Sequence, residues 1–130
     1  MKKQILTLVV IFLAIFATAN FSQAGVTVHF KLNVTDNCIP SGYQGSYCVN
    51  IYIQINNVTY CTHRSCQIGA GNNDIQYNCD LPYSEDVCNY VLHVEICRYT
   101  DPLTCCTSQD YPNQCFDYLL DGNHTYYITL

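Results

Sequence analysis

Apolar and polar residues alternate along three stretches of the chain, as they do in β-strands that bury one face. These stretches run from Gly25 to Val34, from Cys48 to Ile55 and from Tyr90 to Tyr99. The side chains that the alternation directs toward a core are Val26, Val28, Phe30, Leu32, Val34, Val49, Ile51, Ile53, Ile55, Leu92, Val94 and Ile96. Those directed away from it include Cys48, Tyr52, His93, Glu95 and Cys97. Helical periodicity is nearly absent, so the pattern predicts an all-β fold.

Turn signals separate these stretches from shorter strands. Asn56-Asn57 predicts a tight hairpin turn, because Asn tolerates positive φ, and Asp121-Gly122 predicts a second hairpin. The further strands are expected at Val58–Thr62, Asn73–Cys79, Cys115–Leu120 and His124–Leu130. Loops are expected at Gly69–Asn73 and Asp101–Gln114, and a single helical turn at Ser84–Cys88. About seven short strands with one apolar face each predict a disulfide-rich antiparallel β-sandwich, immunoglobulin-like or similar.

The first 24 residues have the three parts of a secretory signal peptide. Lys2 and Lys3 precede an apolar run from Ile5 to Phe16, which is within the roughly 7–15 residues expected of such a run. Small residues follow, and we expect cleavage after Ala24, with Ala17-Thr18-Ala19 as a second site. The run is shorter than the roughly 20 residues of a membrane span. We therefore expect a secreted protein with no membrane insertion after cleavage, and residues 25–130 as a single cysteine-rich domain.

Ten cysteines mark this mature segment as a disulfide scaffold. They are Cys38, Cys48, Cys61, Cys66, Cys79, Cys88, Cys97, Cys105, Cys106 and Cys115. The neighbours Cys105 and Cys106 are expected to take different partners, because a bond between them would strain the bridge. Cys48 and Cys97 face outward and are expected to pair with cysteines in loops. Short-range candidates are Cys38–Cys48, Cys61–Cys66 and Cys79–Cys88, although connectivity is not deducible from the sequence.

Charge excludes some classes of partner. Of the five basic residues, Lys2 and Lys3 are removed with the signal peptide. The mature segment keeps three basic and all ten acidic residues, so its net charge is −7. A nucleic-acid-binding protein needs a basic surface for the phosphates, and docking on anionic lipid has the same requirement. We expect neither nucleic acid nor a membrane surface as partner.

Candidate chemical groups are few. His93 and Glu95 share a strand face and could act as a general acid–base pair or simply as solvated residues. The segment from Cys61 through His63 to Cys66 has three metal-ligand types but lacks the paired cysteines of zinc sites. Asn72-Asn73-Asp74 and Glu85-Asp86 match no calcium loop. We therefore expect no enzyme, no metal and no cofactor.

Two sets of surface residues remain. The sequons Asn33, Asn57 and Asn123 are candidate N-glycosylation sites in a eukaryotic secretory pathway. Tyr43, Tyr47 and Tyr52 are candidates for an exposed aromatic contact surface, with packing under loops as the alternative.

These observations predict a secreted, non-catalytic structural or recognition protein that binds an extracellular protein or glycan. One alternative is a self-assembling fibre or coat subunit, a homo-oligomer that uses the N-terminal strand from Gly25 to Val34. A small carbohydrate-binding module and a secreted inhibitor or toxin are the others.

The first testable prediction is that the mature protein has no free thiol. Each bridge contributes roughly 2–4 kcal/mol, so five together dominate stability. Thiol titration of the denatured, unreduced protein should find no reactive cysteine. Two or more reactive thiols per chain would contradict the scaffold.

Overall fold

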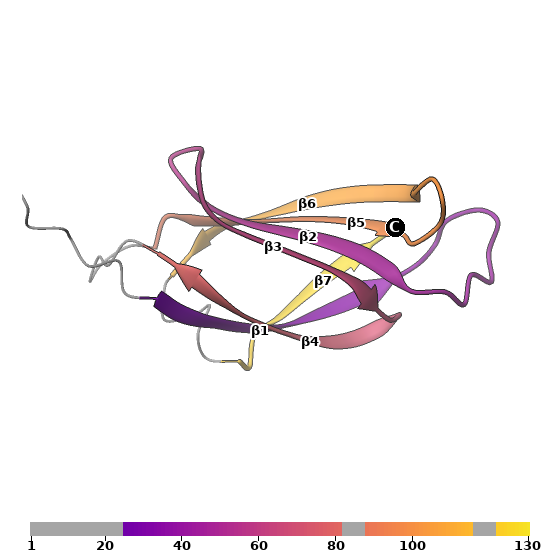
Figure 1. Cartoon of the computed structure of the whole chain (residues 1–130), viewed down its shortest axis with the longest axis horizontal. Coiled ribbons are helices and arrows are strands. Elements are labelled where there is room, and N and C mark those ends of the chain that lie inside the picture. Colours follow the sequence, from indigo (N-terminus) through magenta and orange to yellow (C-terminus); the bar gives the residue numbers. More distant parts are fainter. Residues whose placement is uncertain (1–24, 82–87, 116–121) are drawn as a thin grey trace, which may run out of the picture.

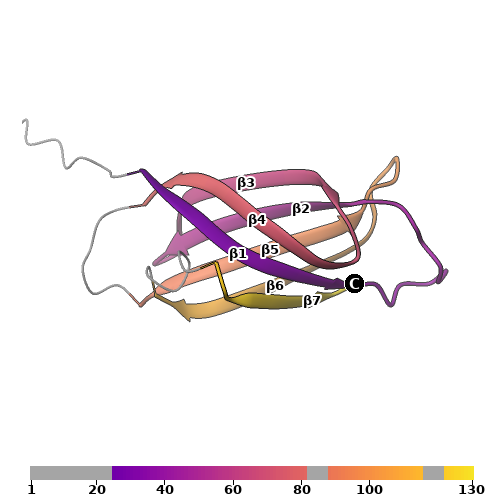
Figure 2. The same cartoon turned by 90° about the horizontal axis from the view of Figure 1, so that it is seen from below.

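The chain folds into two facing β-sheets. The computed structural model describes residues 25–81, 88–115 and 122–130. The strands are β1 (Gly25–Thr35), β2 (Tyr47–Ile55), β3 (Val58–Ile68), β4 (Gly71–Asp80), β5 (Tyr90–Arg98), β6 (Thr104–Gln114) and β7 (Thr125–Thr129). Within these ranges there is no helix able to cross a membrane. One layer holds β3, β2, β5 and β6, and the other holds β4, β1 and β7 (Figures 1 and 2).

Strand order follows mainly from hairpins. The four-stranded sheet has the order β3-β2-β5-β6 and is antiparallel throughout. Asn56 and Asn57 form the β2–β3 turn with φ values of 51° and 64°, as the sequence predicts. In the three-stranded sheet β1 is central, antiparallel to β4 and parallel to β7. The predicted disulfide-rich β-sandwich is confirmed.

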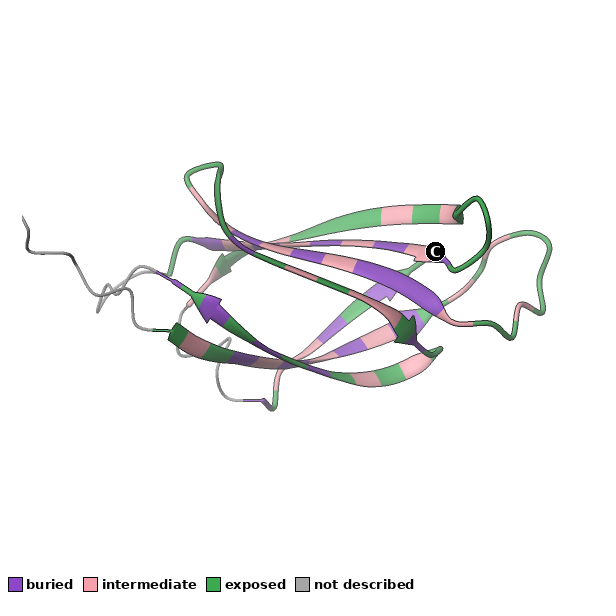
Figure 3. Cartoon of the chain, viewed as in Figure 1, coloured by how far each residue is buried: buried purple, intermediate pink, exposed green. Residues whose placement is uncertain are grey.

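The core lies between the two sheets and is built from residues of both layers. Buried residues alternate with less buried ones along several strands (Figure 3). The inward faces predicted for β1, β2 and β5 are correct, with Val26 and Ile55 only partly buried at their ends. Phe30 and Tyr126 pack edge to face with ring centroids 5.2 Å apart. Both edges of β1 are paired within its own sheet, and its apolar face packs in the core against the other sheet, so neither requires a second chain.

Two predicted loops are wrong. The segment Asp101–Gln114 is largely strand β6, which sequence reasoning missed because an edge strand with mostly exposed residues has no apolar alternation. The segment Gly69–Asn73 is a tight turn running directly into β4. Asn73 Nδ2 closes the turn by donating to the carbonyl oxygens of Gly69 at 2.8 Å and Gly71 at 3.0 Å.

Strand β7, the second half of the predicted C-terminal hairpin, lies parallel to β1. The backbone N–H of Leu130 donates to the carbonyl of Thr35 at 2.9 Å and continues this pairing beyond the strand. Residues 116–121, the rest of that predicted hairpin, and residues 84–87 of the predicted helical turn lie outside the described residues.

All ten cysteines are disulfide-bonded. The bridges are Cys38–Cys105, Cys48–Cys66, Cys61–Cys79, Cys88–Cys115 and Cys97–Cys106. Cys105 and Cys106 take different partners, as the sequence predicts. The three short-range pairings, Cys38–Cys48, Cys61–Cys66 and Cys79–Cys88, are wrong.

Strand geometry explains why Cys61 and Cys66 do not pair, and it also corrects the partners expected for Cys48 and Cys97. Five residues separate Cys61 from Cys66 along β3, about 16 Å of extended chain, whereas a disulfide needs Cα atoms within about 7 Å. Cys48 and Cys97 do face outward, but their partners Cys66 and Cys106 lie on the neighbouring strands β3 and β6 instead of in loops.

The two long margins of the sandwich are closed differently. On one margin β3 runs into β4, and the buried bridge Cys61–Cys79 joins the two sheets. On the other margin β6 faces β7 through tyrosines. The Tyr111 hydroxyl donates to the carbonyl of Tyr127, and the Tyr126 hydroxyl donates to Gln114 Oε1 at 2.6 Å.

The strand β5 register leads to a second prediction. Leu92 is fully buried, and Glu95 lies on the outer face with 43% of its side chain exposed. We expect Leu92→Asp to cost several kcal/mol, because it buries an unpaired carboxylate. We expect Glu95→Ala to cost about 0.5–1 kcal/mol at most. Denaturant unfolding with the disulfides intact measures both, and comparable losses would mean that the register is wrong.

Candidate functional site

A buried ion pair fixes one end of the sandwich. Asp36 follows β1 and Arg98 ends β5, and their side chains are only 9% and 7% exposed. The contact is bidentate, since Arg98 Nε donates to Asp36 Oδ2 at 2.7 Å and Nη2 donates to Oδ1 at 2.9 Å. Such a two-bond contact fixes orientation as well as distance.

Further hydrogen bonds satisfy both charged groups. Arg98 also donates to the carbonyls of Cys38 at 3.1 Å and Pro40 at 3.0 Å. Asp36 accepts from the Tyr47 hydroxyl and from the Cys38 amide, each at 2.9 Å. The ring of Tyr43 covers the guanidinium, 5.0 Å from its centroid. A buried charge pair is tolerated only when partners replace the lost water in this way.

This network perturbs the acidity of its members. The hydrogen bonds from Arg98 lower the pKa of Asp36 to about 2, outweighing the effect of burial. Burial, together with the hydrogen bond to Asp36, raises the pKa of Tyr47 to about 12. Asp36 is thus charged and Tyr47 neutral throughout the physiological range.

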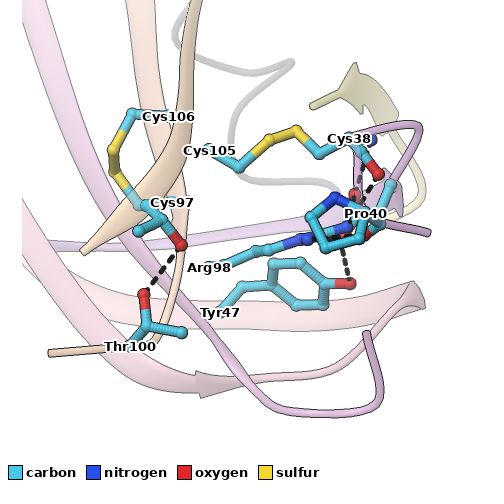
Figure 4. Close-up of a disulfide and its surroundings, with 10 residues drawn as sticks. Cys38, Pro40, Tyr47, Cys97, Arg98, Thr100, Cys105 and Cys106 are labelled. Atoms are coloured by element: carbon cyan, nitrogen blue, oxygen red, sulfur yellow. Dashed lines mark hydrogen bonds and ion pairs between the residues drawn. A yellow bond between two sulfur atoms is a disulfide. The ribbon is translucent and has the colours of Figure 1, made fainter. Parts of the chain in front are cut away.

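The ion pair also positions the adjacent loop. Cys38 lies two residues after Asp36 and is bonded to Cys105 at the start of β6 (Figure 4). Asp36, Cys38 and Cys105 bring three metal-ligand atoms within 4.8 Å of one another, but the cysteines form this disulfide and Arg98 occupies the carboxylate. The cluster therefore acts as a structural anchor.

Sequence reasoning missed this anchor, although one signal was present. Arg98 continues the core-facing series of Leu92, Val94 and Ile96, so a cation at that position requires a buried carboxylate as partner. No local feature of the sequence identifies Asp36, 62 residues away, as that partner.

The outer face of the four-stranded sheet carries a polar network. Tyr52, His93 and Asp110 form one cross-strand row, and Asn50, Glu95 and Ser108 form the next. His93 Nδ1 contacts Asp110, and its Nε2 lies 3.4 Å from Glu95 Oε1. The Tyr52 hydroxyl donates to Glu95 Oε2 at 3.3 Å. Each row thus joins β2, β5 and β6.

His93 and Glu95, the candidate acid–base pair of the sequence, lie inside this network. Burial disfavours the charged imidazole, but the hydrogen bonds to Asp110 and Glu95 outweigh it and raise the pKa of His93. Both ring nitrogens face carboxylates. This arrangement favours the imidazolium form as a link between β5 and β6, and leaves neither nitrogen facing an open position.

The described residues form two open depressions, the second of which shares residues with this network. The first is lined by Arg64, Tyr99, Thr100, Asp101 and Leu103. The second is lined by Asn50, Glu95, Cys97, Cys106, Thr107 and Ser108. Tyr99 is 57% exposed, and Arg64 is exposed with no ion-pair partner in the part of the chain that the structure describes. Neither Arg64 nor Tyr99 was a candidate from the sequence.

Of the three tyrosines that were candidates for a contact surface, Tyr43 and Tyr47 instead follow the alternative of packing within the fold. Tyr47 is buried at 1% exposure, because its hydroxyl reaches Asp36 inside the anchor, so its assignment as an exposed residue is wrong. Tyr43 is half-buried over Arg98, where its hydroxyl donates to the carbonyl of Ser46 at 2.7 Å. Tyr52 faces outward as predicted, but as part of the polar network.

The other predicted candidates lie apart from these depressions. Asn33 is on the outer face of β1, with Nδ2 donating to Asn72 Oδ1 at 2.7 Å, whereas Asn57 and Asn123 are exposed. Their glycosylation remains a prediction. His63 stacks on Tyr77 at 4.4 Å, and both neighbouring cysteines of the candidate metal segment are in disulfides. Asp74 lies 4.0 Å from His29, and Glu85-Asp86 is outside the described residues.

Comparison with protein-family models, curated proteins and solved structures finds no match for the chain.

The anchor generates a third prediction. Its low folded pKa means that Asp36 contributes stability above its unfolded pKa of 3.8, and that this contribution is lost as pH falls from about 4 toward 2. Asp36→Asn leaves Arg98 without its counter-charge and should lower the stability at pH 7 clearly more than loss of an exposed carboxylate does. It should also flatten the fall in stability below pH 4.

Denaturant unfolding between pH 7 and pH 2, with disulfides intact, measures both effects. The matched control is Asp74→Asn, since that side chain is 72% exposed. A control variant as unstable as Asp36→Asn, or an unchanged acid profile in Asp36→Asn, would contradict the role of the anchor.

Proposed function

We propose that the protein is secreted and acts outside the cell as a non-catalytic recognition protein. The disulfide-rich β-sandwich fits an extracellular setting, where such bridges persist. The observation that carries the proposal is a surface at one end of the molecule, which we call the loop-end surface. It comprises Ile39, Arg64, Tyr99 and Leu103, and its three large apolar side chains are 94%, 57% and 39% exposed in the order Ile39, Tyr99, Leu103.

Three features support a binding role for this surface. Its apolar residues come from the β1–β2 and β5–β6 loops, which lie at the same end of the sandwich (Figure 1). The Cys38–Cys105 bridge and the Asp36–Arg98 anchor hold these loops, so binding costs little ordering entropy. Tyrosine and arginine are also the residue types that contribute most strongly to protein interfaces.

Charge indicates the kind of protein partner. The mature net charge of −7 favours encounter with a positively charged surface. Asp101 beside Tyr99 supplies a local carboxylate in the same depression. We therefore assign the partner as an extracellular protein with basic residues around an apolar centre.

A carbohydrate ligand is a second candidate. The depression lined by Asn50, Glu95, Thr107 and Ser108 offers hydrogen-bonding groups at the same end of the outer face as the exposed ring of Tyr99. The fibre alternative has less support, because β1 is already paired on both edges within its own sheet.

The fourth prediction tests the loop-end surface by selection from a random peptide library displayed on phage, with the mature protein as bait. Selected peptides should be rich in Lys and Arg around apolar residues. Tyr99→Ala and Leu103→Ala should each weaken their binding tenfold or more, since truncating an interface hot spot costs about 2 kcal/mol or more. Raising the ionic strength should slow association.

The control is Tyr127→Ala, which removes an equally exposed tyrosine (67%) from the opposite sheet. Peptides that lose affinity for Tyr127→Ala while binding Tyr99→Ala normally would overturn the assignment of the surface. A glycan array read with the same variants decides the second candidate: Tyr99-dependent binding of sugars, with no peptide selected, would replace the protein partner by a glycan.

A further inference from the structure

Four cysteines lie in a row across the outer face of the four-stranded sheet. They are Cys66 on β3, Cys48 on β2, Cys97 on β5 and Cys106 on β6. The two inner members, Cys48 and Cys97, are direct partners in the antiparallel register of β2 and β5. Each is nevertheless bonded outward to an edge strand, in the bridges Cys48–Cys66 and Cys97–Cys106.

Irregularities in the sheet bring the outer members into this row. The β2–β3 register shifts between Tyr47 and Val49, at Cys48, and the β5–β6 register shifts between Ile96 and Arg98, at Cys97. The row therefore follows the direction of the interstrand hydrogen bonds. Directly opposed residues have Cα atoms about 4.5–5.5 Å apart, which is within the range that a disulfide accepts. Cys48 and Cys97 are thus placed to bond to each other.

Accessibility determines where a reagent would enter the row. Cys106 is exposed and lines the second depression together with Cys97, whereas Cys48 is only 3% exposed. The bridge Cys61–Cys79 is buried and faces the core. The bridge Cys88–Cys115 has an exposed cysteine too, but Cys88 precedes β5 at the end of the strand remote from Cys97. Among the five bridges, only Cys97–Cys106 combines an exposed cysteine residue with a second disulfide beside it in register.

We propose that this row is a site of thiol–disulfide exchange with an external thiol. The thiolate of the reagent attacks Cys106 Sγ and forms a mixed disulfide, and the electron pair of the broken bond leaves on Cys97 Sγ. The Cys97 thiolate then attacks Cys48 Sγ, and the bond to Cys66 breaks with its electron pair on Cys66 Sγ, which takes a proton from water. Two disulfides enter and two leave, so no oxidant is needed.

The exchange moves the covalent link from the sheet edges to its centre. Strand β2 becomes bonded to β5, while β3 and β6 lose one bridge each. The remaining bridges, Cys61–Cys79, Cys38–Cys105 and Cys88–Cys115, still hold β3, the start of β6 and the end of β6. The sandwich therefore stays closed while the floor of the second depression changes. This inference does not depend on the proposed recognition function.

The fifth prediction uses a double variant, Cys66→Ser with Cys106→Ser. It leaves Cys48 and Cys97 without their native partners, and they should form a new bridge. Peptide mass spectrometry under non-reducing conditions should recover the Cys48–Cys97 pair, and titration should find no free thiol. The matched control is Cys66→Ser with Cys115→Ser, which also removes two native bridges.

The control leaves Cys48 and Cys88 without their disulfide partners. Cys97 lies opposite Cys48 in the register of β2 and β5, and Cys88 precedes it by nine residues. Nine residues of extended chain span about 30 Å, so Cys48 and Cys88 are too far apart to bond. The control should show two free thiols per chain. Two free thiols in a folded Cys66→Ser, Cys106→Ser protein would overturn the proposal.

The native protein provides a test that does not depend on how the variants fold. It is treated briefly with 2-mercaptoethanol, a small thiol that carries no charged group besides its reacting thiolate, and quenched with an alkylating agent. The expected products carry a modified Cys106 and Cys66 and contain a Cys48–Cys97 bridge. Equal modification of Cys97 and Cys106, with Cys48–Cys66 intact, would show simple reduction and contradict the exchange.

Discussion

The geometry of one end of the sandwich depends on the buried ion pair between Asp36 and Arg98. Two charges leave water there, and only a bidentate contact with further hydrogen bonds offsets that cost. The requirement is geometrically strict, so it determines where β1 ends, where β5 ends and how the intervening loop approaches β6. The bridge between Cys38 and Cys105 joins the same segments, since Arg98 also donates to the carbonyl of Cys38.

The two faces of the four-stranded sheet differ in their chemistry. Its inner face is apolar and packs on the smaller sheet, whereas its outer face carries titratable groups, hydroxyls and disulfides. On that outer face a histidine between two carboxylates links strands that backbone pairing alone would hold less firmly. Because the core needs no contribution from these outward residues, they are available for contacts with other molecules.

How far the sequence predicts this structure depends on the range of each interaction. Alternation identifies the inward faces of β1, β2 and β5, because burial of one face imposes a period of two. Strand β6 cannot be recognised by this alternation, since it lies at an edge and mainly Tyr111 packs against the core. Disulfide partners depend on which strands become neighbours, and a list of cysteines does not encode that. The same holds for Asp36 and for the depression beside Arg64 and Tyr99, whose members are distant along the chain.

The unlike margins of the sandwich give the molecule a mechanical polarity. The bridge between Cys61 and Cys79 cannot open under thermal motion, whereas hydroxyl contacts such as that of Tyr111 with Tyr127 can break and re-form. The bridge Cys38–Cys105 also ties the start of β6 to the segment after β1, so the β6–β7 side is held covalently at that end. Local opening between the two layers is therefore expected first toward the Gln114 end of β6, where the described contacts are the tyrosine hydroxyls.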